Sequence, residues 1–298
     1  MLRRMVVFMN GNAQDLMKLI QSRFQRMSKG QKLIAEYILK HYDKAAFMTA
    51  ARFGKTVGVS ESTVVRFANE LGYSGYPQLQ AALQEMIKTK LTSVQRIELS
   101  EDQINEKNTV KAVLKADIDN IRSTMDKVNT FTFEESVRAM LNAKKIYIVG
   151  FRSSQVLAEF MSFYLCLLLD NIKLVSVGMN DVYEQLVRVG EDDLVIGIGF
   201  PRYSTRTVEA LAYAKNRGAK VLALTDSMLS PLAVHADYCL VAQSNMASFA
   251  DSLVAPLSVI NALIVSVSLK KKDTISDTFN NLEGLWSEHN VYIQKTRE

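Results

Sequence analysis

The segment between residues 49 and 79 carries polar side chains at a spacing that suits contact with DNA. Residues 61–71 form a candidate helix with one apolar stripe at i, i+3, i+4 and i+7, made of Val64, Phe67, Ala68 and Leu71. The side chains around it include hydroxyls, an amide and cations, which can reach base edges and phosphates. The candidate DNA-binding residues are Lys55, Ser60, Ser62, Thr63, Arg66 and Asn69.

Capping residues place this helix second in a helix-turn-helix pair. Thr49 is a candidate N-cap for a first helix, and Gly58 follows where the chain must turn. Ser60 can cap the second helix because its hydroxyl accepts from free amides of the first turn. Gly72 can end that helix in the left-handed conformation. The pair therefore predicts a recognition helix that enters the major groove.

Further helices are expected on both sides of this pair. Ser28 and Gln31 form a capping box for one helix, which follows another at about residues 16–24. Pro77 is expected to open a helix downstream. Together these elements predict an all-α helix-turn-helix domain of about five helices over residues 14–91, after an N-terminal extension over residues 1–13.

Positive charge is concentrated on the same part of the chain. Residues 1–97 contain 15 Lys and Arg against 6 Asp and Glu, whereas residues 98–298 contain 21 against 25. Such asymmetry fits a polyanionic partner. A solvated basic surface or a membrane contact would also carry this charge, but no basic amphipathic anchor stands out. Double-stranded operator DNA is therefore the expected partner.

Residues 92–131 are expected to form a linker that contains a long helix. The first part, residues 92–108, is polar. Apolar residues then recur at spacings close to a heptad repeat: Val110, Leu114, Ile118, Ile121, Met125 and Val128. This repeat fits a seam between two chains, and it fits equally a connector helix that lies on its own domain.

Short apolar runs alternate with helical segments after a helix that is expected to begin at Thr132. The runs lie at residues 146–149, 172–177, 194–198, 220–224 and 238–241. The alternation predicts a doubly wound α/β domain with a five-stranded parallel sheet covered on both faces, over residues 132–278. A C-terminal tail is expected at residues 279–298. Ligands of such sheets bind beyond the carboxyl ends of the strands.

Two of these strand ends carry an arginine just before hydroxyl residues that open a helix. The candidate ligand-binding residues are Arg152, Ser153 and Ser154 after the first strand, and Arg202, Tyr203, Ser204 and Thr205 after the third. Free amides at a helix N-terminus, with hydroxyls beside them, suit a phosphate. Hydroxyl residues at a helix start are commonly caps alone. Their repetition with arginine on neighbouring strands predicts an anion pocket.

Composition also bears on whether the chain is a membrane, secreted or metal-binding protein. A hydrophobic share of 48% with 22% charged residues is ordinary for a soluble protein. The longest apolar run, residues 254–269, is interrupted by polar residues and is expected to be a buried helix, too short for a bilayer. The apolar core of residues 1–9 is too short for a signal peptide, so a cytoplasmic location is expected. The two cysteines and three histidines show no metal-ligand spacing, so neither metal nor cofactor is expected.

Taken together, these segments resemble the RpiR family of bacterial transcription regulators. That family joins an N-terminal helix-turn-helix domain to a C-terminal SIS (sugar isomerase) domain that senses phosphosugars. The resemblance covers nearly everything after about residue 14 and rests on IAEYIL (34–39), VGVSESTVVRFANELGYSGYPQLQ (57–80), LTDSMLSPLAVHAD (224–237) and SFADSLVAPLSVINALI (248–264). It implies that residues 61–71 are the recognition helix. It also implies that residues 151–154 and 200–205 are the phosphate loops.

Two departures from the family pattern bear on the ligand. Many SIS domains have glycine where Arg152 stands, and their third-strand loop usually reads like SFSGET, whereas this chain has GFPRYS. Gly199 and Pro201 thus replace two serines that the family uses for phosphate. Arg152 and Arg202 are expected to supply the anion binding instead.

The expected function is a ligand-responsive DNA-binding transcription regulator without enzymatic activity. It would sense a phosphorylated or acidic sugar metabolite and form a homodimer or homotetramer. An alternative is a phosphosugar isomerase or lyase on the same fold, which needs a base such as Glu209, Glu184 or His235. A third hypothesis is a DNA-binding dimer whose pocket is vestigial.

Overall fold

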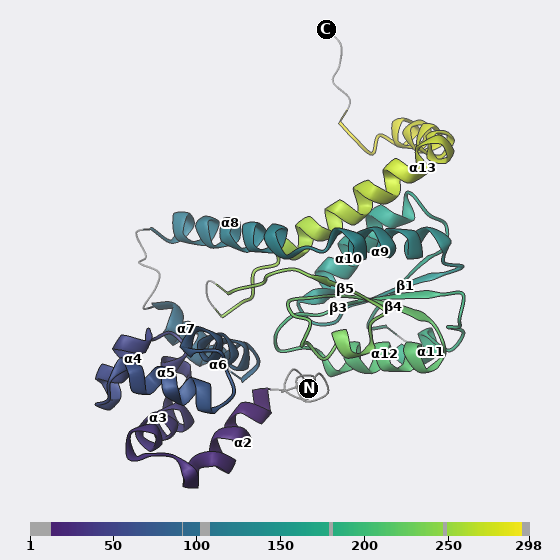
Figure 1. Ribbon diagram of the computed structural model, residues 1–298. Coiled ribbons are helices and arrows are strands. Elements are labelled where there is room, and N and C mark those ends of the chain that lie inside the picture. The colour runs from purple at the N-terminus through teal and green to yellow at the C-terminus, as the bar shows by residue number, and fades with distance from the viewer. Residues whose placement is uncertain (1–12, 91, 102–107, 179–180, 247–248, 294–298) are drawn as a thin grey trace. The chain divides into compact units, whose positions relative to one another are not determined.

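The computed structural model describes residues 13–90, 92–101, 108–178, 181–246 and 249–293, and it contains two compact units (Figure 1). The first unit ends at Asp102 and the second begins at Gln103. The expected N-terminal extension lies outside the described residues except for its last position, Ala13. Each unit has its own core and is described by itself.

The first unit is helical throughout its described part. Its elements are α2 (Ala13–Arg23), η2 (Phe24–Arg26), α3 (Lys29–Ala45), α4 (Ala50–Val57), α5 (Glu61–Glu70), α6 (Tyr76–Lys90) and α7 (Ser93–Glu101). The predicted capping box is confirmed at the start of α3, where Ser28 and Gln31 exchange hydrogen bonds. Ile34, Phe53 and Phe67 are completely buried at the centre of this unit. The helix α7 occupies part of the segment that was expected to be a polar linker.

The second unit is built on five parallel strands. They are β1 (Ile146–Val149), β2 (Ile172–Val175), β3 (Leu194–Ile198), β4 (Lys220–Thr225) and β5 (Tyr238–Val241). Their order in the sheet is β2-β1-β3-β4-β5, and every neighbouring pair is parallel. This confirms the predicted five-stranded α/β fold. The carboxyl ends of β1, β3 and β4 therefore meet along one edge of the sheet.

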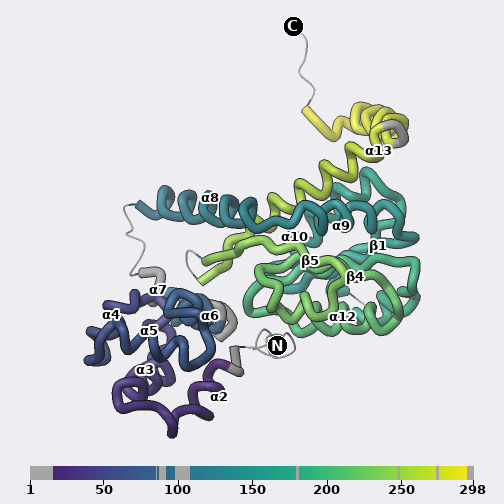
Figure 2. Tube along the Cα trace, viewed as in Figure 1, coloured from purple at the N-terminus to yellow at the C-terminus, as the bar shows by residue number. Residues whose placement is uncertain are grey.

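Helices cover both faces of this sheet (Figures 1 and 2). The described helices of the second unit are α8 (Thr109–Lys127), α9 (Thr130–Asn142), α10 (Ser154–Cys166), α11 (Val182–Gln185), α12 (Thr205–Asn216), η4 (Ala233–His235) and α13 (Val254–Glu288). Side chains of β1 alternate between two cores. Ile146 and Ile148 pack with α9, α10 and α13, whereas Tyr147 and Val149 pack with α11 and α12. This alternation is the period-2 geometry of a strand buried on both faces.

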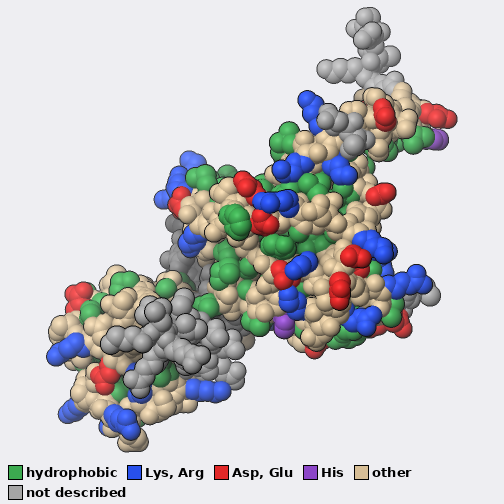
Figure 3. All heavy atoms as spheres, turned by 45° about the vertical axis from the view of Figure 1, so that its right-hand side comes forward, with side chains coloured by type: hydrophobic (Ala, Val, Ile, Leu, Met, Phe, Trp, Pro, Cys, Tyr) green, Lys and Arg blue, Asp and Glu red, His purple; other side chains and the backbone are tan. Residues whose placement is uncertain are grey.

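The helix α13 differs from its prediction in length. It runs to Glu288, through the boundary expected at residue 278. The stretch Val254–Lys272 is long and apolar enough to cross a membrane by length and composition, so the expectation of too short a run was wrong. Ala255, Ile260 and Leu263 of this stretch are buried in the core of the unit, whereas Val265 and Leu269 are exposed, so the helix that was expected to be buried is buried on one side only. Other hydrophobic side chains of the second unit reach its surface (Figure 3).

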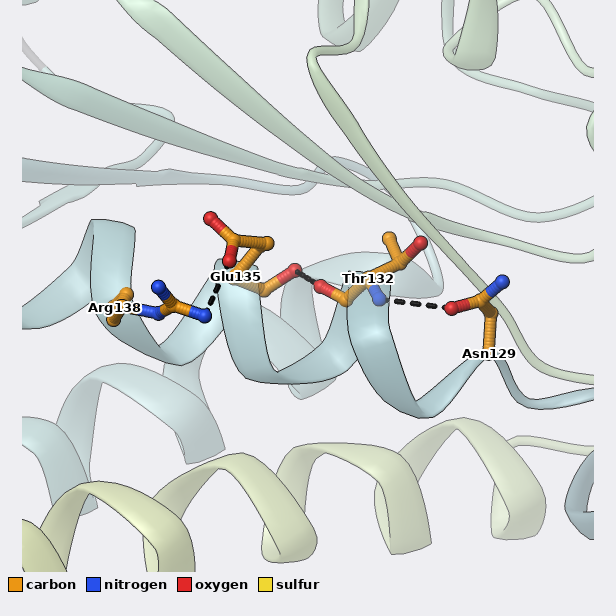
Figure 4. A network of polar contacts seen from close by, with 5 residues as sticks. Asn129, Thr132, Glu135 and Arg138 are labelled. Atoms are coloured by element: carbon orange, nitrogen blue, oxygen red, sulfur yellow. Dashed lines mark hydrogen bonds and ion pairs between the residues drawn. The ribbon is translucent and has the colours of Figure 1, made fainter.

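The helix α9 begins slightly earlier than predicted, and its cap explains why (Figure 4). The Asn129 Oδ1 atom accepts a hydrogen bond from the Thr132 amide at 2.9 Å. One turn further along, Arg138 and Glu135 form an ion pair. An asparagine cap satisfies a free amide of the first turn. The helix therefore starts at Thr130, two residues before the start expected at Thr132.

Candidate functional site

The helix-turn-helix pair is held by the caps that the sequence predicts. The Thr49 hydroxyl accepts from the Arg52 amide at 3.2 Å, and the Ser60 hydroxyl accepts from the Thr63 amide at 3.3 Å. The chain turns between the helices at Gly58, whose φ of 76° is left-handed. A Cβ atom at Gly54 would lie 2.7 Å from the Val59 carbonyl oxygen, so α4 approaches the turn too closely for a side chain.

The apolar stripe of α5 is buried as predicted. Val64, Phe67 and Ala68 are completely buried, and Leu71 is nearly so. The described helix ends at Glu70, and Gly72 follows with a left-handed φ of 96°. Burial of one stripe leaves the opposite side of α5 available to a partner.

Four predicted DNA-binding side chains form one hydroxyl–arginine cluster at the start of α5. The Ser60 Oγ atom lies 2.9 Å from both Ser62 Oγ and Thr63 Oγ1. Arg66 folds back over this group, donating from Nε to the Ser62 carbonyl at 3.3 Å and from Nη2 to Thr63 Oγ1 at 3.4 Å. Free helix amides, hydroxyls and a guanidinium thus share one exposed patch, which suits phosphate and base-edge contacts.

The two remaining predicted DNA-binding residues lie outside the hydroxyl–arginine cluster. Asn69 is exposed on α5, seven residues after Ser62 and therefore on the same side of the helix. Lys55 is exposed on α4. The structure thus brings four of the six predicted residues together and leaves the other two as separate exposed groups.

Two arginines at the carboxyl edge of the sheet have left-handed backbones. Arg152 lies in the loop after β1 with a φ of 62°, and Arg202 lies in the loop after β3 with a φ of 61°. Left-handed geometry costs a residue with a side chain about 1–2 kcal/mol. Strain of this kind is found preferentially where a side chain has a function. Because β1 and β3 are paired, both exposed side chains lie along the same edge.

The serines beside these arginines do not cap their helices. Ser153 and Ser204 occupy the N-cap positions of α10 and α12, yet neither side chain makes a capping hydrogen bond in these described helices. Helix capping therefore does not explain the hydroxyls at these two positions. Ser154 is buried in the first turn of α10, whereas Thr205 is exposed at the start of α12.

A buried carboxylate completes this edge, and sequence reasoning assigned it no role. Asp226 follows β4 directly and is only 3% exposed. The Tyr203 hydroxyl, predicted as a ligand contact, donates to Asp226 Oδ1 at 2.6 Å. The only signal in the sequence was the position of Asp226 at a strand end. We name the group of Arg152, Arg202, Tyr203 and Asp226 the strand-end site.

Gly199, where the resemblance leads us to expect a serine, is closely packed against the core. A Cβ atom at Gly199 would lie 2.8 Å from Leu232 Cδ2. Leu232 is completely buried and belongs to the core beneath α12. A serine at position 199 would therefore require this leucine to move, so the altered loop and its core neighbour match each other.

The candidate bases of the isomerase alternative have local partners. The Glu184 Oε2 atom accepts from the Asp181 amide at 2.9 Å in the capping box of α11. Glu209 is exposed on α12 and lies 3.5 Å from the Tyr183 hydroxyl. His235 lies on the short helix η4. Glu184 and Glu209 therefore each make a contact that stabilises local structure.

Comparison with family models identifies both units. Residues 14–90 match the helix-turn-helix domain of the rpiR family, and residues 139–266 match the SIS domain. The chain belongs to the RpiR family of transcription regulators. In this RpiR-family protein, α4 and α5 are the helix-turn-helix pair within the first matched domain, and the strand-end site lies within the matched SIS domain.

Relatives of this RpiR-family protein extend over most of its length. An HTH-type transcriptional regulator of Haemophilus influenzae is 28% identical over 230 residues, which are 76% of this chain and 79% of the relative. HexR of Pseudomonas aeruginosa, also an HTH-type transcriptional regulator, is 26% identical over 86% of this chain and 90% of its own length.

Solved structures of similar fold support the same assignment. The sugar isomerase domain of an RpiR transcription factor from Sphaerobacter thermophilus is 28% identical, covers 59% of this chain and 98% of its own, and has a TM-score of 0.57. NanR of Vibrio vulnificus, solved with ManNAc-6P, is 20% identical with a TM-score of 0.55 over 92% of this chain and 98% of its own. The latter likeness concerns the fold alone.

Proposed function

We propose that this regulator binds operator DNA through α5 and senses an anionic, sugar-like metabolite at the strand-end site. The observation that carries the effector part is the pair of left-handed arginines, Arg152 and Arg202, in equivalent loops on adjacent strands. Two strained arginines at equivalent positions are difficult to explain as packing, because both side chains are exposed.

The two arginines of the strand-end site suggest the chemical class of the effector. A guanidinium can hold a phosphate or a carboxylate through two parallel hydrogen bonds. Helix amides can add further donors, and so can the hydroxyls of Ser153 and Ser204, which do not cap their own helices. The similarly folded NanR was solved with a phosphorylated amino sugar. We therefore propose a phosphorylated or acidic sugar, bound through Arg152 and Arg202 in place of the serines that the family loop usually provides.

Hydrogen bonds connect the strand-end site to α8. Tyr203 binds the Asp226 carboxylate, and the Asp226 carbonyl accepts from Gln243 Nε2 at 3.5 Å. The Gln243 backbone amide donates to the buried Thr124 Oγ1 on α8 at 2.8 Å. Asn120, one turn earlier on α8, exchanges two hydrogen bonds with the Asn245 backbone. An effector that favours one arrangement of these loops would therefore bias the position of α8.

We further propose that the protein is a cytoplasmic, non-enzymatic homodimer. Helix-turn-helix proteins bind two half-sites as dimers, one recognition helix in each major groove. The roles of Glu184 and Glu209 in local structure favour binding over proton transfer. A regulator of this kind acts where bacterial DNA lies, which is the cytoplasm.

A thermal-shift screen against sugar phosphates, amino-sugar phosphates and sugar acids tests the effector proposal. A compound present at about 100 times its Kd should raise the Tm of the second unit by roughly 5–10 °C. Arg202→Ala and Ser154→Ala should abolish this shift. Arg217→Ala, which removes an exposed arginine at the other end of α12, is the matched control and should retain it.

Three results would contradict this proposal. A compound that shifts both Arg202→Ala and Ser154→Ala as it shifts the unchanged protein would place its site elsewhere. Turnover of a hit compound by the purified protein would favour the isomerase or lyase alternative. The absence of any hit across the three classes would favour a vestigial pocket.

A further inference from the structure

The linker helix α8 has an apolar stripe that the described residues of its own unit leave uncovered. The stripe consists of the heptad residues Val110, Leu114, Ile118, Ile121, Met125 and Val128, which are 38–71% exposed. A different face of α8 is buried, and it is polar, with Asn120 and Thr124 at its centre. This helix thus buries polar groups against its own unit and exposes its apolar ones, the reverse of an ordinary surface helix.

The polar face fixes α8 in one register on its own unit. Thr124 Oγ1 also donates to the Asn120 carbonyl at 2.8 Å. The Asp117 carboxylate accepts from the Ser252 hydroxyl at 2.6 Å. These contacts, with those from Gln243 and Asn245, hold three successive turns of the helix. The stripe is therefore presented by a preformed helix, so association at it does not have to order the segment.

The spacing of the stripe selects its partner. From Leu114 onward the residues alternate by 4, 3, 4 and 3, which places Ile118 and Met125 at heptad a positions and Leu114, Ile121 and Val128 at d positions. A stripe of this period packs against a helix of the same period. The helix of this protein with a matching exposed stripe is α8 of a second copy.

The charges beside the stripe select the orientation. In this register, Asp117 occupies a g position on one edge, and Lys115 and Arg122 occupy e positions on the other edge. A parallel pair brings Asp117 of one helix to Arg122 of the other, which is attractive. An antiparallel pair brings Lys115 to Arg122, which is repulsive. Arg122 is exposed and forms an ion pair with Asp119 of its own helix at 3.3 Å, and Asp117 is partly exposed and accepts from Ser252, so the contact between chains would add to these local ones.

We infer that α8 of two chains pair in parallel along this stripe and form a dimer seam. The seam itself does not depend on the proposed function, but its effect on DNA binding does. α8 lies directly after the boundary between the units. The same helix carries the dimer seam on one face and the hydrogen bonds from the strand-end site on another. Effector binding would then act on the seam that sets the spacing of two DNA-binding units.

The test measures the mass of the full-length protein by sedimentation equilibrium, without DNA or effector. The unchanged protein should be a dimer. Ile118→Asp places two carboxylates in the seam and should raise the dimer Kd by roughly 100-fold or more. Asp126→Lys, a charge change on the same helix away from the stripe, should leave the dimer Kd unchanged. Circular dichroism of each variant confirms that it has folded.

Charge exchange and cross-linking test the parallel orientation. Arg122→Glu should weaken the dimer by roughly tenfold, and Asp117→Lys combined with it should restore most of the loss. Met125→Cys should form an intermolecular disulfide on oxidation, because equivalent a positions face each other only in a parallel pair. The unchanged protein, with Cys166 and Cys239 alone, is the control.

The outcomes separate this inference from the proposed function. A monomeric protein, or a dimer that Ile118→Asp leaves intact, overturns the seam. Failure of Met125→Cys to cross-link overturns the parallel orientation. These measurements use neither ligand nor DNA, so they stand whether or not the effector screen succeeds.

Discussion

The two candidate sites differ in how the chain assembles them. The hydroxyl–arginine cluster of α5 draws its four members from seven consecutive residues, Ser60 to Arg66, and its contacts span no more than four positions. The strand-end site joins loops after three strands, and its Tyr203–Asp226 hydrogen bond spans 23 residues. Its link to α8 spans 119 residues, from Thr124 to Gln243. A local site can be deduced from helix caps and periodicity, whereas a site at a sheet edge depends on topology.

The two sites also use their arginines differently. Arg66 lies on a regular helix and folds back onto its own hydroxyl neighbours. Arg152 and Arg202 hold strained backbones in loops. The DNA-binding patch thus follows from ordinary helix geometry, whereas the strand-end site maintains conformations that cost stability. Substitutions in the two sites should therefore differ in their effects on stability and on binding.

The largest effect is expected from Phe67→Ala in the first unit. Phe67 is completely buried in the stripe of α5. Truncating a buried phenylalanine costs about 3–5 kcal/mol of unfolding free energy. Calorimetry should show the transition of the first unit lowered or lost, with DNA binding lost as well. The effector-induced shift of the second unit should persist, and its loss would show that the two sites are not independent.

A smaller effect is expected from Arg66→Ala. This change should weaken operator binding by about 1–3 kcal/mol if the guanidinium contacts a base or a central phosphate. Fluorescence anisotropy with a duplex selected from a random pool measures the change, and Arg217→Ala in the second unit is the control. The slope of affinity against salt should also become shallower. An unchanged affinity would remove Arg66 from the DNA contacts.

The strain at the strand-end site predicts a gain in stability at the expense of binding. Arg152→Gly relieves the left-handed backbone, although the glycine adds entropy to the unfolded chain. The unfolding free energy of the second unit should therefore stay level or rise by up to about 1 kcal/mol, while effector affinity falls. Urea denaturation and effector titration measure the two quantities. Lower stability with unchanged effector affinity would mean that the conformation serves packing.

The smallest effect concerns alkaline pH and the first unit. Burial raises the pKa of Tyr76 to about 12 from an ordinary value near 10. Its stabilising contribution is therefore complete below pH 10 and is lost as the pH rises from 10 to 12. Tyr76→Phe should flatten this loss. The same change removes the hydrogen bond to the Met48 carbonyl and should cost about 1 kcal/mol at neutral pH. A slope that persists in Tyr76→Phe would assign it to another group.

The same contrast explains what could be predicted from the sequence. The caps at Ser28, Thr49 and Ser60 were predicted because each satisfies amides of its own helix. The five strands were predicted because continuous apolar runs indicate burial on both faces. The helix α7 was missed because its polar composition carries no periodic stripe. The length of α13 was missed because the largely polar stretch at residues 270–278 interrupts its apolar run.

The sequence predicted the two arginine loops of the strand-end site but not the contact that joins one of them to Asp226. The sequence placed Arg152 and Arg202 after strands, and parallel topology brought those strand ends together. It could not show that Tyr203 would bind Asp226, because a side-chain pair across two loops leaves no periodic trace. The packing of Leu232 against Gly199 was hidden for the same reason. The heptad repeat of α8 was visible, but only burial shows that it faces outward.

The most direct test of the account is a titration of the selected DNA duplex with and without a compound found in the thermal-shift screen. A saturating compound should change the Kd of the unchanged protein for DNA by at least about fivefold. The Arg202→Ala variant should bind DNA with the original Kd and show no response to the compound. An unchanged Kd for DNA in the native protein, at a concentration where the compound demonstrably binds, would contradict the account.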